Sequence, residues 1–144
     1  MHKFASVTLH PSLPDQSYQT DAARLWGVPQ EHVYTDDVRG IAKTTNWGGK
    51  LGQRQELIAA LKLVRGEPAA VFFATPLCVG FTPRHAVETF SEIWECRAGL
   101  FVYSMAQLFE PWDGVEALIE QIERDKKAAA QRAWRAKQGG SKIV

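Results

Sequence analysis

The stretch 69-AAVFFA-74 is the part of the chain that most directly indicates a fold. It contains no polar side chain, and Pro68 and Pro76 bound it closely on either side. An uninterrupted apolar run of this length is typical of a central strand in a parallel sheet, because helices cover both faces of such a strand. We therefore expect a central strand here, with Phe72 or Phe73 in the main core.

Strand-like and helix-like segments alternate on both sides of this run. Short strands are expected over 4–9, 32–35 and 100–105, and helices over 15–26, 55–64, 82–97 and from Asp113 to about Lys137. The glycine- and asparagine-rich segment 38–52 is expected to be a mobile loop, and Gly139-Gly140 to end the last helix. This alternation predicts an α/β protein with a mostly parallel sheet.

The composition fits a single globular domain. Of 144 residues, 45% are hydrophobic and 23% charged, which excludes disordered, collagen-like and coiled-coil proteins. No apolar run approaches the roughly 18 residues of a membrane span, and the first residues lack the apolar segment of a secretory signal. Cys78 and Cys96 form no disulfide or metal pattern, so we expect a cytoplasmic protein without membrane contact. We divide the chain into a core over 1–112, a long helix over 113–138 and a flexible tail over 139–144.

Charge is distributed unevenly along the chain. Between Arg124 and Lys142 there are seven basic residues and one acidic residue, Asp125. The rest of the chain has ten basic and 15 acidic residues, so the formal net charge of +1 combines an acidic body with a basic end. Two interpretations stay open. The cations either lie at a solvated helix end, where the helix dipole favours them, or form an arm that contacts phosphates.

The sequence offers no pattern for a metal or a cofactor. His2, His10, His32 and His85 are scattered, and no spacing typical of zinc ligands occurs. No glycine-rich nucleotide motif follows an expected strand. We therefore predict neither a metal nor a cofactor.

One arrangement of residues resembles a known family. The expected first strand runs into His10-Pro11-Ser12-Leu13-Pro14-Asp15-Gln16-Ser17, directly before a helix. This segment resembles the end of the first strand in serine recombinases of the resolvase/invertase type, and Ser12 falls on their nucleophilic serine. Further matches follow in the same order: His32-Val33-Tyr34-Thr35-Asp36, Arg54-Gln55-Glu56-Leu57, Arg65-Gly66-Glu67 before the run 69–74, and the long basic C-terminal helix. The resemblance implies a resolvase-like βαβ core, with Ser12 and Arg54 as vestigial catalytic residues.

The departures from the family pattern concern its cations. Active serine recombinases have Asp-Arg-Leu-x-Arg-Ser after the buried strand, and its two arginines clamp the scissile phosphate. This sequence has Thr75-Pro76-Leu77-Cys78-Val79-Gly80 there, and His10 replaces the arginine of the first strand. Transition states of phosphoryl transfer depend on such positive groups. Arg39, Arg84 and His10 are the alternatives that would have to supply the charge, and Ser12 is otherwise a turn or capping residue.

The C-terminal helix carries the remaining predictions. Its apolar stripe either covers the sheet of its own subunit or, as the resemblance implies, forms a dimer contact through Leu118 and Ile122. Its basic end is the predicted DNA-binding segment, consisting of Lys126, Lys127, Arg132, Arg135 and Lys137. The family adds a helix-turn-helix module beyond this helix, and we expect no base-reading domain in a sequence that stops at Val144.

Three functions are compatible with these patterns. The favoured one is a non-catalytic resolvase-like protein that acts by binding DNA or another recombinase subunit, as a homodimer or in association with that subunit. The second is an active site-specific recombinase that uses Ser12 for DNA recombination. The third is a structural or regulatory adaptor that binds no nucleic acid, which the acidic body and low net charge favour.

Overall fold

The computed structural model describes residues 1–40, 50–111 and 113–142. The strands are β1 (His2–Leu9), β2 (Val33–Asp37), β3 (Ala69–Phe73), β4 (Gly99–Val102) and β5 (Gln107–Phe109). The helices are α1 (Gln16–Trp26), α2 (Gln55–Leu63), α3 (Pro76–Val79), α4 (Pro83–Glu95) and α5 (Glu116–Lys142), with single 3₁₀ turns at Gln30–His32, Leu51–Gln53 and Tyr103–Met105.

The predicted fold class is confirmed. The five strands form one sheet in the order β2-β1-β3-β4-β5, in which β5 alone is antiparallel to its neighbour. This is an α/β fold with a mostly parallel sheet and a long C-terminal helix, consistent with a resolvase-like βαβ core. Strand β3 lies in the middle of the sheet, and all its residues, including Phe72 and Phe73, are buried as the apolar run predicts.

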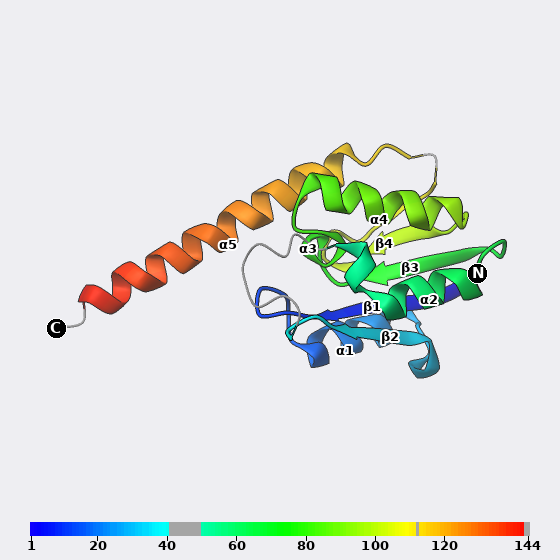
Figure 1. Ribbon diagram of the computed structural model, residues 1–144, viewed down its shortest axis with the longest axis horizontal. Coiled ribbons are helices and arrows are strands. Elements are labelled where there is room, and N and C mark those ends of the chain that lie inside the picture. The colour runs from blue at the N-terminus through cyan, green and yellow to red at the C-terminus, as the bar shows by residue number, and fades with distance from the viewer. Residues whose placement is uncertain (41–49, 112, 143–144) are drawn as a thin grey trace.

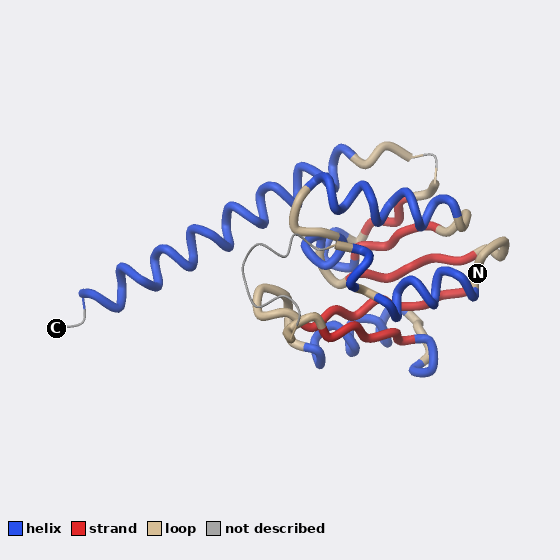
Figure 2. Tube along the Cα trace, viewed as in Figure 1, coloured by secondary structure: helices blue, strands red, loops and turns tan. Residues whose placement is uncertain are grey.

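Helices cover the sheet on both faces. Helix α1 lies on one face, whereas α2 and α4 lie side by side on the other (Figures 1 and 2). This arrangement follows from the strand order, since the chain leaves β1 in one direction for β2 and returns in the other for β3. The predicted start of α4 is confirmed in detail, because Thr82 caps the helix by accepting from the His85 N–H, and Pro83 occupies its first turn.

Helix α5 has two parts with different surroundings. Its first turns pack against α3 and α4, and its second part leaves the body and projects into solvent (Figure 1). The helix begins at Glu116, not Asp113, and it continues through Gly139 and Gly140 to Lys142. The helix end expected at Gly139-Gly140 is therefore wrong, whereas the flexibility of the tail stays a prediction, and residues 143–144 lie outside the described part of the chain.

Other boundaries also differ from the expectations. The strand expected over 100–105 ends at Val102, and the chain then turns into the antiparallel strand β5. The four-residue helix α3 and strand β5 were not expected, because neither has a periodic pattern of its own. Residues 41–49 of the expected mobile loop lie outside the described residues. In the described ranges, no helix is long and apolar enough to cross a membrane.

Candidate functional site

The sheet opens at its carboxyl edge between β1 and β3. Strand β1 pairs with β3 only over His2–Ala5, but it pairs with β2 as far as Leu9. The connections from β1 and to β3 run on opposite faces of the sheet, so this is its topological switch point. In open α/β sheets, ligands bind in the crevice at such a point, outside the carboxyl ends of the strands. The segments after β1 and β3 therefore define the candidate site.

Ser12 lies at the rim of this crevice. It is exposed in the turn after β1, where its N–H donates to Nδ1 of His10 over 3.0 Å. A cavity of about 340 Å³ lies beside it, between the Ser12 turn, the start of α3 and helix α5. Thr75, Asp125 and Arg132 are among the residues that line it. The predicted serine and one predicted DNA-binding residue, Arg132, therefore line the same cavity.

Arg54, the second predicted catalytic residue, lies inside the body and faces away from solvent. Its Nη1 donates to the carbonyl oxygen of Cys78 over 2.7 Å. Its Nη2 donates to the carbonyl oxygen of Val79 over 2.7 Å and to the hydroxyl of Thr89 over 2.9 Å. The side chain is fully buried, and burial lowers its pKa to about 10. Arg54 therefore fixes the end of α3 to α4, and this structural role is what the structure shows for the residue expected to be vestigially catalytic.

Asp36 is a buried carboxylate whose charge interacts with that of Arg54. Its two carboxylate oxygens accept the N–H groups of Glu56, over 2.8 Å, and of Leu57, over 3.1 Å, at the start of α2. Burial raises the pKa of Asp36, while these two N–H groups and the charge of Arg54 oppose that rise. Since carboxylates at a helix N-terminus satisfy otherwise unpaired donors, Asp36 anchors α2 to the end of β2. Asp36 belongs to a sequence segment that resembles the family, but this structural role was not predicted.

His10 does not supply the missing positive charge. Its ring is buried and packs edge-on against Phe81, with the ring centroids 5.0 Å apart. Burial lowers its pKa, and its Nδ1 accepts the Ser12 N–H, which requires that nitrogen to be unprotonated. His10 is therefore a neutral imidazole at neutral pH.

The other two cations that could supply the charge, Arg39 and Arg84, form ion pairs on the surface. Arg39 forms a two-pronged ion pair with Asp37, with Nε and Nη2 2.9 and 2.7 Å from the carboxylate oxygens. Arg84 lies 3.7 Å from Glu88 on the exposed side of α4. Neither residue is among those that line the cavity beside Ser12.

Gln19 closes the crevice where β1 and β3 separate. The Gln19 amide is fully buried and takes the place of the hydrogen bonds that β3 no longer provides to the end of β1. It accepts the Thr8 N–H over 3.2 Å and donates to the Thr8 carbonyl over 2.9 Å. It also donates to the carbonyl of Pro14 over 2.8 Å. The thiol of Cys78 lies beside the same amide, and burial raises the pKa of that thiol. The groups that bond to the Gln19 amide are neutral, and neither Cys78 nor Cys96, both buried, has the environment of a nucleophile.

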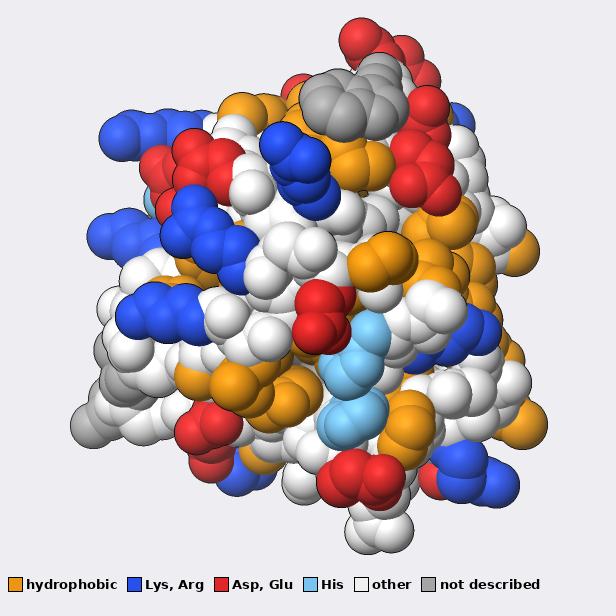
Figure 3. Space-filling model, turned by 90° about the vertical axis from the view of Figure 1, so that its right-hand side faces the viewer, with side chains coloured by type: hydrophobic (Ala, Val, Ile, Leu, Met, Phe, Trp, Pro, Cys, Tyr) orange, Lys and Arg blue, Asp and Glu red, His pale blue; other side chains and the backbone are white. Residues whose placement is uncertain are grey.

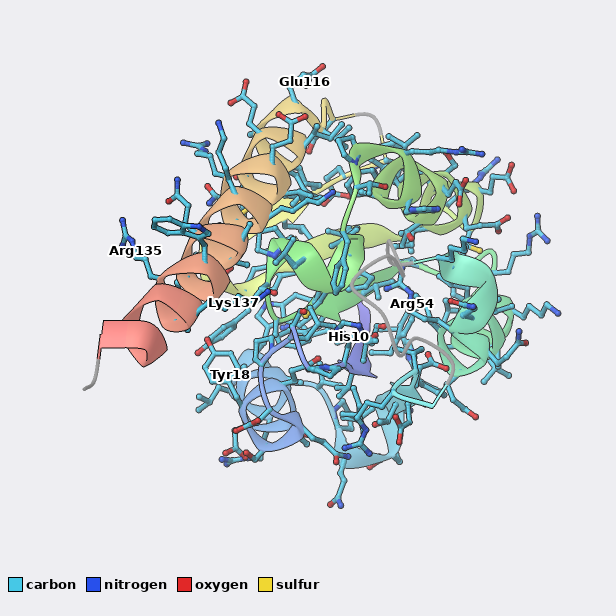
Figure 4. The ribbon with its side chains drawn as sticks, turned by 60° about the vertical axis from the view of Figure 1, so that its left-hand side comes forward. His10, Tyr18, Arg54, Glu116, Arg135 and Lys137 are labelled. Carbon is cyan, nitrogen blue, oxygen red and sulfur yellow. The ribbon has the colours of Figure 1, made fainter. Side chains whose placement is uncertain are left out.

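The predicted DNA-binding residues are all exposed on α5. Lys126, Lys127, Arg132, Arg135 and Lys137 all lie on the part of the helix that follows its packed first turns. Figure 4 places Arg135 and Lys137 on the projecting helix, and His10 and Arg54 within the body. On the side of the body facing away from the projecting helix, acidic and basic side chains are interspersed (Figure 3). The basic cluster seen in the sequence therefore lies on the projecting helix, while this face of the body carries charges of both signs.

Leu118 and Ile122 are core residues of the subunit. Both have no exposed surface, because the first turns of α5 bury them against the body. The expectation of a dimer contact through these two side chains is therefore wrong, since a side chain without exposed surface cannot contact a second molecule. The alternative holds, in which the stripe covers the subunit's own body.

Sequence reasoning missed two features of the site. Gln19 gave no signal, because its partners depend on how the first strand and helix pack. Trp134 did give a signal in the sequence, because it is the single aromatic residue between Arg124 and Lys142. In the structure its side chain is 62% exposed. Among the described residues, no group of three or more histidine, cysteine, aspartate or glutamate side chains is arranged to hold a metal ion.

A scan against protein-family models finds no match, and a search of curated proteins finds no significant one.

Proposed function

We propose that this protein is a resolvase/invertase-like DNA-associated protein that binds DNA through the basic part of α5 and does not cleave it. The observation that carries the proposal is the exposure of Lys126, Lys127, Arg132, Arg135 and Lys137 on a helix that leaves an otherwise acidic body. Clustered lysine and arginine provide the sequence-independent part of nucleic-acid affinity. A cytoplasmic location goes with this proposal and is supported by two free cysteines.

The cations on α5 are suited to phosphates rather than to a partner within the subunit. Asp125 is the last acidic residue of the chain, and its Oδ1 already accepts from the side chain of Gln121 over 2.8 Å. The basic segment therefore has no acidic neighbour further along the helix. A polyanion would relieve the repulsion among these like charges, and DNA is the polyanion that the resemblance suggests.

The proposed lack of cleavage is supported by the state of the crevice. A serine hydroxyl needs an activating base and positive groups that stabilise the charge developing on the phosphate. Arg54 is committed to carbonyl oxygens, and His10 is neutral and buried. Removing a single arginine that acts at the transition state costs about 10³–10⁵ in rate. Among the described residues that line the cavity beside Ser12, Arg132 is the one cation, and the carboxylate of Asp125 lines the same cavity.

Binding is tested by fluorescence anisotropy on a labelled duplex at ~50 mM salt, where phosphate contacts are strong. One variant replaces the five cations of α5 by glutamine. The matched control replaces five exposed cations outside α5, namely Arg24, Lys50, Lys62, Arg65 and Arg84, and so has the same net charge. The proposal requires binding by the parent and the control and its loss in the α5 variant. Equal loss in both variants, or no binding by the parent protein, would favour the adaptor function.

Cleavage is tested separately with supercoiled DNA. The protein is incubated with the DNA and denatured, and the mixture is searched for a covalent protein–DNA complex. The proposal requires that none forms. A complex that appears with the parent protein and disappears in Ser12→Ala would establish the active recombinase instead.

A further inference from the structure

We infer that Trp134 stacks on an unpaired nucleobase, so that the nucleic acid held by α5 is single-stranded or locally unpaired. This inference rests on the proposed function and specifies its substrate. It begins from the indole of Trp134, which is 62% exposed on α5. Two other tryptophans pack within the body instead, since Trp26 stacks on Phe101 at 4.3 Å and Trp94 on Phe90 at 5.3 Å.

Helical spacing places cations around the indole. Lys127 lies seven residues before Trp134 and Lys137 three residues after it, so both share its face of the helix. Ala130, four residues before, is also on this face and is too small to cover the ring. The exposed indole is therefore flanked along the helix by two exposed ammonium groups. Ring and charge together match a nucleotide, which presents a flat base and an anionic phosphate.

The positive charge on the Trp134 face of α5 determines which kind of molecule can bind there. A second copy of the chain would bring the same lysines together, and like charges disfavour such contact. An anionic membrane is also a poor match. Helices that lie on membranes bury several large apolar side chains, whereas the apolar residues of 126–137 are Trp134 and alanines. A nucleic acid needs only one flat apolar surface beside cations, which is what this face provides.

Stacking further restricts the nucleic acid. In an intact duplex the faces of the bases are covered by their neighbours, so an indole has no free face to contact. An unpaired base exposes its face, and aromatic stacking on it tolerates any sequence. This matches a segment whose exposed side chains are mainly cations, since cations contact phosphates without distinguishing bases.

The test compares two single strands with the same number of phosphates, a 20-mer of thymidine and a 20-mer of abasic residues, in anisotropy titrations at ~50 mM salt. The parent protein should bind the thymidine strand about tenfold more tightly than the abasic strand, because alanine substitution at a stacking position typically costs about that much or more per base. Trp134→Ala should bind both strands equally, and Trp134→Phe should retain most of the preference. Leu25→Ala, which removes a side chain 69% exposed on α1, is the matched control and should change neither affinity.

The outcomes separate the two levels of the proposal. If the parent binds both strands alike, or if Trp134→Ala keeps the preference, the stacking inference is overturned while DNA binding by α5 stands. If the parent binds neither strand nor duplex, the proposed function fails as well. Binding to phosphatidylserine vesicles that Trp134→Ala abolishes, without binding to nucleic acid, would overturn both in favour of a membrane surface. Circular dichroism of each variant establishes that the fold is intact.

Discussion

The guanidinium of Arg54 donates to the carbonyl oxygen of Cys78 over 2.7 Å, which joins the residue before α2 to the end of α3. Cys78 lies in the segment where the resemblance would place a phosphate-clamping arginine. The arginine that the resemblance would make catalytic therefore stabilises a segment that has no arginine of its own. Because three described acceptors are satisfied by this cation, its removal is a test of structure rather than of chemistry.

We expect Arg54→Met to lower the free energy of unfolding by about 3–5 kcal/mol, since it leaves buried acceptors and the buried carboxylate of Asp36 without their cation. Urea denaturation followed by circular dichroism measures this change. Arg24→Met, on the exposed side of α1, is the control and should stay within about 0.5 kcal/mol of the parent. A decrease of similar size in both variants, or in neither, would show that Arg54 is not a structural cation.

Gln19→Ala should destabilise the protein by about 3 kcal/mol, because it leaves the N–H and carbonyl of Thr8 unpaired in the buried crevice. Gln16→Ala changes the same residue type at an exposed position of the same helix and should have little effect. The comparison is made by thermal unfolding of the two variants. If the two midpoints are equal, the amide of Gln19 does not hold β1 at the point where it leaves β3.

The buried imidazole of His10 predicts a dependence of stability on pH. Burial lowers the pKa of the folded form below its ordinary value of 6.5, so below that pH the unfolded chain binds a proton that the folded protein resists. The contribution of the neutral His10 side chain to the free energy of unfolding is therefore complete above pH 6.5. It is lost as the pH falls toward the pKa of His10 in the folded protein. Denaturation at a series of pH values from 7 to 5 should show a shallower decrease in stability for His10→Asn than for the parent. Parallel curves would contradict the prediction.

Leu118→Ala and Ile122→Ala should each cost about 2–5 kcal/mol of stability, as expected for large-to-small changes in a core, without altering the oligomeric state of the folded protein. Sedimentation velocity and urea denaturation measure the two properties. Leu63→Ala, at a side chain that is 71% exposed, is the control for stability. A variant that keeps its stability but shifts from dimer to monomer would restore these residues to an interface between subunits.

The sequence supported the fold better than the site because the two depend on different signals. The run 69–74 and the Thr82-Pro83 pair specify a buried strand and a helix start through local chemistry alone, and both predictions are confirmed. Arg54 shows the opposite case, since its partners lie 24 to 35 residues further along the chain. A charged residue before a helix gives no local indication that it will be buried.

Two misjudged boundaries have similar causes. Strand β5 has only three residues, and its pairing with β4 is a tertiary contact without a sequence pattern of its own. Gly139 and Gly140 each disfavour a helix by about 1 kcal/mol, and this cost is too small to end α5, which continues to Lys142. The stripe of α5 was correctly seen as apolar, but periodicity does not distinguish a side chain that packs within its own subunit from one that packs on a partner.

The salt dependence of duplex binding tests the central claim, that the cations of α5 contact phosphates, most directly. The logarithm of the binding constant should fall linearly with the logarithm of the salt concentration, with a slope of about −0.9 for each phosphate neutralised. Replacing Arg132, Arg135 and Lys137 by alanine should reduce the magnitude of that slope by between two and three, at ~0.9 for each phosphate that is no longer neutralised. Replacing the exposed cations Arg24, Lys62 and Arg65 by alanine should leave the slope unchanged. An unchanged slope in the α5 variant, or equal changes in both, would contradict the claim.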